Sequence, residues 1–75
     1  MNSIDELIKM GKKQLEDRQY DDALNLFQKA ILLNQNDPDL WNLKGIALRS
    51  IGQYNEAIEC FNKSLEIDPR DKNAS

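Results

Sequence analysis

Apolar residues recur at three- and four-residue spacing in four separate stretches of this chain. Spacing of this kind places side chains on one face of an α-helix, so each stretch predicts an amphipathic helix. The expected helices cover about 4–17, 21–33, 38–51 and 55–67. Their inward faces are, in chain order, Ile4, Leu7, Met10 and Gly11, with Ile8 and Leu15 at one edge; Ala23, Leu24, Phe27, Ala30, Ile31 and Leu33; Trp41, Gly45 and Leu48; and Ala57, Ile58, Phe61, Leu65 and Ile67.

Signals for helix ends flank these stretches. Ser3 followed by Glu6 has the spacing of a capping box. Asp37 before Pro38 combines a favoured N-cap residue with the residue preferred at the first helical position. Further signals predict N-caps at Asp21 and Asn55 and a left-handed helix end at Gly52. The pattern therefore predicts two helical hairpins joined by the polar connector 34–37.

The two hairpins repeat each other at an offset of 34 residues without a gap. Identical pairs include Gly11/Gly45, Tyr20/Tyr54, Ala23/Ala57 and Phe27/Phe61. Glycine and alanine at these places allow two helix axes to approach closely, and Trp41, Tyr54 and Phe61 are expected to fill the space beside them. Paired helices with this period are typical of a stacked helical repeat.

The repeat resembles the tetratricopeptide repeat. The second hairpin carries the family's residues at Trp41, Gly45, Tyr54, Ala57, Phe61 and Pro69, and the first at Leu7, Gly11, Tyr20, Ala23, Phe27 and Ala30. It departs from the family at Lys44, Leu48, Ser64 and Gln35. The resemblance implies an all-α fold of two antiparallel hairpins stacked as a right-handed solenoid. We expect repeats at 4–37 and 38–71, with 72–75 as a tail or the start of a truncated third repeat. The alternative is an up-and-down four-helix bundle.

Composition narrows the class of protein. The chain has 75 residues, 40% hydrophobic and 31% charged, with a net charge of −3, which is typical of a small globular domain and disfavours nucleic acid as the main partner. Its longest apolar run, 30–33, is too short to cross a bilayer, and no secretion leader opens it. The one cysteine, Cys60, cannot form an internal disulfide. We therefore expect a cytoplasmic protein.

Residues for catalysis are sparse. The chain has no histidine, which disfavours a histidine general base, and its one cysteine disfavours a zinc site. Its three glycines are widely separated, which disfavours a glycine-rich phosphate loop. Cys60 is expected to be a semi-buried helix residue, because Glu56 and Glu59 do not supply the positive surroundings of a reactive thiol. Carboxylates gather at predicted helix starts, where they favour capping over acid–base chemistry: Asp5, Glu6, Asp21, Asp22 and Asp39. We expect no enzyme, cofactor, metal or small-molecule substrate.

The family resemblance also implies a binding surface along the first helix of each hairpin. The corresponding positions are Asp5, Ile8, Lys9, Lys12, Leu15 and Glu16 in the first repeat, and Asp39, Asn42, Leu43, Ile46, Arg49 and Ser50 in the second. Apolar residues among them indicate a groove for a peptide or helix, although packing between repeats explains them equally well. Lys9, Lys12 and Arg49 favour an acidic partner. The function expected is a non-enzymatic protein-interaction module, and the alternatives are an RNA-binding helical repeat or a self-assembling structural repeat.

The last helix carries a stripe that its hairpin partner can cover only in part. Stacked repeats bury their apolar faces against neighbours, and about three are normally needed. We therefore expect either that the chain is part of a longer array or that copies associate weakly through this stripe, which consists of Ile58, Phe61, Leu65 and Ile67.

Overall fold

The computed structural model describes residues 3–69, which form four helices and no other regular element within that range. They are α1 (Ile4–Glu16), α2 (Tyr20–Leu33), α3 (Pro38–Ser50) and α4 (Tyr54–Ile67). The all-α fold predicted from the helical periodicity is confirmed. The predicted tail or third repeat at 72–75 lies outside the described residues.

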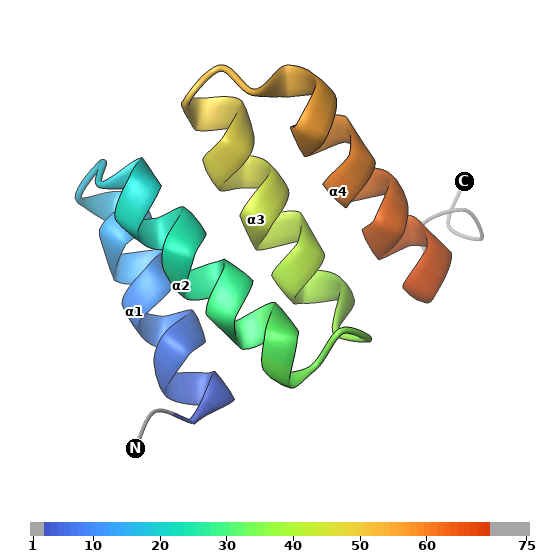
Figure 1. Ribbon diagram of the computed structural model, residues 1–75, viewed down its shortest axis with the longest axis horizontal. Helices are drawn as coiled ribbons and strands as arrows, with labels where there is room; N and C mark the ends of the chain where they lie inside the picture. The colour runs from blue at the N-terminus through green and yellow to red at the C-terminus, as the bar shows by residue number, and fades with distance from the viewer. Residues whose placement is uncertain (1–2, 70–75) are drawn as a thin grey trace.

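The helices lie side by side in a row, each antiparallel to the next (Figure 1). The extensive contacts join α1 to α2, α2 to α3 and α3 to α4, and α3 also touches α1. The outer helices α1 and α4 stand at opposite ends of a flat molecule of 36 × 28 × 18 Å. A four-helix bundle would pack α1 extensively against α4, so the stacked-hairpin alternative is the correct one.

Two of the four predicted N-caps are present and two are not. The capping box at α1 is confirmed, because the Glu6 amide donates to Ser3 Oγ at 3.2 Å and the Ser3 amide donates to Glu6 Oε1 at 3.2 Å. Asp37 caps α3 as predicted, with Oδ1 accepting from the Asp39 amide at 3.0 Å. The caps predicted at Asp21 and Asn55 are wrong. Both residues already lie inside the first helical turn.

The geometry of the two hairpin turns explains that error. After α1, Arg18 is left-handed (φ 64°) and the Gln19 amide donates to the Gln14 carbonyl at 2.8 Å. After α3, Gly52 is left-handed (φ 88°), as predicted, and the Gln53 amide donates to the Leu48 carbonyl at 2.9 Å. These are Schellman endings. Each glutamine closes one helix and immediately precedes the next, so the turns are too short for a separate cap.

One glycine–phenylalanine contact holds each hairpin together. A Cβ on Gly11 would lie 2.4 Å from the Phe27 ring, and a Cβ on Gly45 would lie 2.6 Å from the Phe61 ring. Both distances are far inside an ordinary carbon–carbon contact of about 3.5 Å. The expectation that small residues bring the helix axes together is therefore confirmed at both glycines, and Ala23 and Ala57 are buried beside them.

Trp41 connects the two hairpins. Its side chain is partly buried and packs against both core clusters, one centred on the first hairpin and α3 and the other on α3 and α4. Its indole Nε1 donates to the Gln35 carbonyl at 2.8 Å, and Lys44 Nζ lies 5.4 Å from the ring centroid. Trp41 thus fixes the connector against the helix that follows it.

Four residues predicted to point inward are exposed instead. Ile58 is 55% exposed, because the buried face of α4 is centred on Ala57, Cys60 and Ser64. Leu33 and Tyr54 are 62% and 63% exposed, because they are the last residue of α2 and the first of α4, where helix packing ends. Met10 is 44% exposed. The buried face of α1 is centred on Leu7 and Gly11, and the edge of this face that packs against the core is the one with Ile8, opposite Met10.

Candidate functional site

A hollow of about 550 Å³ opens between the parallel helices α1 and α3. Both helices start at the same end of the molecule (Figure 1), so their first turns line one end of the hollow. Its lining consists of Asp5, Ile8 and Lys12 from α1 and of Asp37, Asp39, Asn42 and Leu43 at and after the start of α3. We call this hollow the α1–α3 groove.

The apolar floor of the α1–α3 groove comes from Ile8 and Leu43. Each side chain is partly buried and packs against the core cluster of the first hairpin. Each also lines the groove. Packing between the repeats and lining of a groove, which the sequence left as alternatives, are therefore both present at these two residues.

The charges of the groove are three carboxylates and one ammonium group. Asp37 holds its place through its bond to the Asp39 amide. Within residues 3–69 the one salt bridge is Lys13–Asp17, at 4.0 Å, so Asp5, Asp39 and Lys12 are not ion-paired with any described residue. Asp5, Asp39 and Lys12 are exposed. These groups are available to a ligand, and their balance at the helix starts is acidic.

Six of the twelve residues predicted for the binding surface do not line the groove, and two of these six, Glu16 and Ser50, are simply exposed. Lys9 is exposed on α1, Leu15 packs against the core, and Ile46 is partly buried on α3. The Arg49 guanidinium lies 5.9 Å from the centroid of the Phe61 ring, toward α4. Asp37, which the sequence indicated only as a cap, also lines the groove. Its position two residues before Asp39, at the same end as Asp5, was the available signal.

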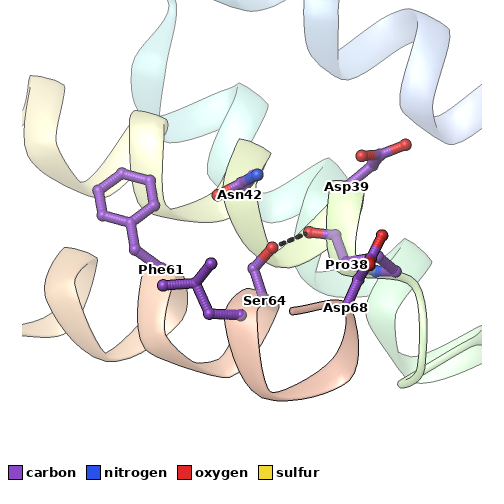
Figure 2. A pocket seen from close by; sticks show the side chains of 7 residues that line it. Pro38, Asp39, Asn42, Phe61, Ser64 and Asp68 are labelled. Carbon is purple, nitrogen blue, oxygen red and sulfur yellow. Dashed lines mark hydrogen bonds between the residues drawn. The ribbon is translucent and has the colours of Figure 1, made fainter. Parts of the chain in front are cut away.

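A second, smaller hollow of about 250 Å³ lies between α3 and α4. Figure 2 shows the Ser64 hydroxyl directed at the Pro38 carbonyl, to which it donates at 2.9 Å, with Phe61 toward one end and Asp39 and Asp68 toward the other. We call it the α3–α4 hollow, and its lining is Pro38, Asp39, Asn42, Phe61, Ser64, Leu65 and Asp68. Phe61 and Leu65 belong to the stripe predicted for self-association. The other two stripe residues lie outside the lining, Ile58 being 55% exposed and Ile67 partly buried.

Cys60 is buried more deeply than expected, with 5% of its surface exposed. Burial raises the pKa of its thiol, and Glu56 and Glu59 raise it further against the opposing effect of Lys44. The thiol is therefore protonated near neutral pH and lacks the character of a catalytic nucleophile. Among residues 3–69 no three His, Cys, Asp or Glu side chains are grouped to hold a metal ion.

Across the described part of the chain, no helix combines the length and apolarity that crossing a membrane requires.

Two helical hairpins that repeat at 34 residues and stack in a row define a helical-repeat protein. The tetratricopeptide-repeat family model matches residues 38–71. Together with the four helices of the fold, this match shows that the chain belongs to the tetratricopeptide-repeat family, as its resemblance implied.

Curated relatives share this repeat in very different contexts. An uncharacterized protein of Methanocaldococcus jannaschii is 48% identical over 46 residues, covering 61% of this chain and 54% of the relative. The peroxisomal targeting signal receptor of Candida glabrata is 30% identical over 71 residues, covering 92% of this chain and 12% of the receptor. Human anaphase-promoting complex subunit 7 is 42% identical over 52 residues, covering 69% of this chain and 9% of the subunit. The chain thus spans about half of the first relative and about a tenth of the other two.

Proposed function

We propose that this protein is a non-enzymatic interaction module that binds a peptide or helix of a protein partner in the α1–α3 groove. The observation that carries the proposal is the groove itself, which joins an apolar floor, Ile8 and Leu43, to charged groups without ion-pair partners among the described residues. Hydrophobic contact would supply affinity, and the charges would orient the ligand. Protein-recognition names among the relatives, such as the targeting signal receptor, agree with this class of function.

The charge distribution refines the kind of partner. Three basic residues of the predicted surface favoured an acidic partner, yet only Lys12 of the three lines the groove, beside three aspartates. We infer a peptide of mixed charge, with a basic side chain near Asp39 and an acidic side chain near Lys12. A polyanion such as RNA fits this lining poorly, because the carboxylates would repel its phosphates.

The test begins with capture of bound peptides from an extract of the source organism, followed by calorimetric titration of the identified peptide. Lys12→Glu is expected to weaken binding several-fold, chiefly through slower association that depends on salt. Leu43→Ala is expected to weaken it by loss of apolar contact. Lys29→Glu is the matched control, since Lys29 is an exposed lysine on α2 that does not line the groove.

Arg49→Glu separates the groove from the rest of the predicted surface. Because its guanidinium lies over Phe61, this variant is expected to bind the peptide as the unaltered protein does. If the Lys12→Glu and Leu43→Ala variants bind the captured peptide as tightly as the unaltered protein does, the α1–α3 groove is excluded as the site of that peptide.

A further inference from the structure

A third hollow lies between α2 and α3, the two central helices of the row (Figure 1). It has a volume of about 280 Å³ and is lined by Gln28, Ile31 and Leu32 of α2 and by Lys44 of α3. We call it the α2–α3 hollow. It shares no lining residue with the α1–α3 groove or with the α3–α4 hollow, so neither of those sites accounts for it.

An apolar surface continues from the α2–α3 hollow onto the end of α2. Ile31 is 7% exposed, whereas Leu32 is 77% exposed and Leu33 is 62% exposed. Leu32 is the most exposed of the large apolar side chains among residues 3–69. A single exposed leucine is common on protein surfaces, but an exposed apolar surface that leads into a hollow is typical of an interaction site.

Further repeats would not cover this surface. At the offset of 34 residues, the counterpart of Leu32 is Glu66, and the counterpart of Lys44 is Met10. Glu66 is exposed although another hairpin precedes its own, and Met10 is 44% exposed although another hairpin follows its own. A hairpin stacked in the same manner at either end of the chain would therefore leave the α2–α3 hollow open. Packing of repeats does not account for the exposed leucine.

The charge beside the apolar surface is positive. Lys44 is partly buried and is the charged member of the lining, and its Nζ lies 5.4 Å from the centroid of the Trp41 ring. In the described part of the chain the one salt bridge is Lys13–Asp17, so no carboxylate there is paired with Lys44. Lys29 is exposed three positions before Leu32, and residues at that spacing are neighbours on a helix surface.

The carboxylates of the neighbouring elements lie outside the α2–α3 hollow. Asp37 and Asp39 line the α1–α3 groove. Glu56 and Glu59 act with Lys44 on the pKa of Cys60, but they are exposed on α4 and do not line the hollow. The hollow thus combines apolar side chains with a basic group, and its complement is an aliphatic side chain next to a carboxylate.

Two other occupants fit this surface less well. A contact between the same surfaces of two copies of the chain would bring the Lys29 and Lys44 ammonium groups of both copies together. An anionic membrane attracts clusters of about four to eight basic residues, whereas this surface has Lys29 and Lys44 on a chain with a net charge of −3. A segment of another protein needs only one carboxylate to match one lysine, so it is the occupant that the charges favour.

We propose that the α2–α3 hollow binds a segment of a partner protein in which an aliphatic residue stands next to an acidic one. The aliphatic side chain lies in the hollow against Ile31 and Leu32, and the carboxylate lies at the Lys44 ammonium group. This site is separate from the α1–α3 groove, and it stands or fails independently of the function proposed for that groove.

The probe for this site is a pair of peptide libraries displayed on phage. In one library aspartate or glutamate flanks leucine or isoleucine, and in the other lysine or arginine takes the acidic position, with all remaining positions random. Both are selected on the immobilised full chain after peptides that bind the Leu32→Glu variant have been removed. The enriched peptides are then synthesised and titrated into the ¹⁵N-labelled full chain, and the amide chemical shifts are followed.

The internal repeat supplies substitutions that this fold already accepts. Leu32→Glu introduces the residue found at the equivalent position 66, and Lys44→Met introduces the residue found at position 10. Leu32→Glu is expected to weaken peptide binding at least about tenfold, because it removes an apolar contact. Lys44→Met is expected to weaken it about two- to fivefold at low salt, as for an exposed ion pair, and less at high salt.

Two matched controls make the same kinds of change elsewhere. Ile58→Glu alters an apolar residue of α4 that is 55% exposed, and Lys9→Met alters an exposed lysine of α1. Neither residue lines the α2–α3 hollow, so both variants are expected to bind the peptides as the unaltered chain does. The shifts expected on binding occur at the amides of Gln28, Leu32 and Lys44.

Several results would overturn the proposal. One is the absence of peptides that depend on Leu32, and another is equal enrichment of the acidic and basic libraries. Shifts confined to Ile8 and Leu43 would place the peptides in the α1–α3 groove instead. Flotation of the full chain with vesicles of phosphatidylcholine and phosphatidylserine, lost in Leu32→Glu, would identify a membrane as the occupant. Shifts at Leu32 that follow protein concentration alone and that no peptide displaces would identify a second copy.

Discussion

The paired glycines permit one substitution to be made in two nearly identical surroundings. A Cβ added at Gly11 would lie 2.4, 2.8 and 2.9 Å from three atoms of the Phe27 ring, and one added at Gly45 would lie 2.6, 2.9 and 3.0 Å from the Phe61 ring. In each case the ring must retreat by about 1 Å to restore ordinary contact. The two sites differ in what surrounds each phenylalanine ring. Phe27 is fully buried under α3, whereas Phe61 is partly exposed beside the α3–α4 hollow.

Opposing effects decide the outcome at each glycine. Alanine in place of a mid-helix glycine stabilises by about 0.5–1 kcal/mol, and overpacking destabilises by about 1–3 kcal/mol. We expect Gly11→Ala to lower the free energy of unfolding by about 1–2 kcal/mol, because Phe27 has nowhere to move. Gly45→Ala should lower it by less than about 1 kcal/mol, since Phe61 can shift toward the hollow.

Urea unfolding, followed by far-ultraviolet circular dichroism and by Trp41 fluorescence, measures both values. A Phe27→Leu background is the control: Gly11→Ala should destabilise less there, because the smaller side chain leaves room for the methyl group. The argument that α3 confines Phe27 while nothing equivalent confines Phe61 would be refuted if both alanine variants lost the same free energy of unfolding. It would also be refuted if Gly11→Ala raised that free energy.

Three further predictions concern the turn, the thiol and the surface of α4. Arg18 has a left-handed backbone, which costs an arginine more than the glycine found at the equivalent position 52, so Arg18→Gly should raise the free energy of unfolding by about 1 kcal/mol in urea titrations. Gly52→Ala should lower it by a similar amount through backbone strain alone, since no neighbouring atom lies within 4 Å of the added methyl group. Cys60 should react with a thiol reagent at pH 8 only as fast as the α3–α4 pair opens, so urea below the unfolding midpoint should accelerate labelling; reaction at the rate of a free thiol would contradict its burial. Weak self-association through the stripe that contains Phe61 and Leu65 should appear in sedimentation at rising concentration, because this stripe is covered only in part; a strict monomer at every concentration would disprove it.

The fold could be predicted from the sequence because the residues that determine it recur at regular spacing. Gly11 and Gly45 occupy the same place in two copies, and that agreement identified both the helices and the close contacts between them. The errors arose where residues serve two elements at once. Gln19 and Gln53 end one helix and precede the next, so Asp21 and Asn55 had no cap position left to occupy.

The candidate site was accessible only in part, for a related reason. The family positions identify which residues of α1 and α3 share a side, but the depth of the hollow depends on how the hairpins are stacked. Arg49 lies on the predicted side yet points toward Phe61, and Asp37 precedes the helix yet lines the groove. Neither placement follows from helical periodicity, because each depends on a neighbouring helix that the local pattern does not describe.

The hydrogen bond from the Trp41 indole to the Gln35 carbonyl has a consequence for exchange of hairpins between chains. Domain swapping requires the connector between two units to straighten into a hinge. Here the connector is anchored to the helix that follows it, and the same side chain packs in both core clusters. Straightening would remove Trp41 from both clusters and leave its indole N–H to find another acceptor. The connector therefore holds the two hairpins in a fixed relation, so a peptide in the proposed α1–α3 site would meet a groove whose curvature is already set, and binding would cost less conformational entropy.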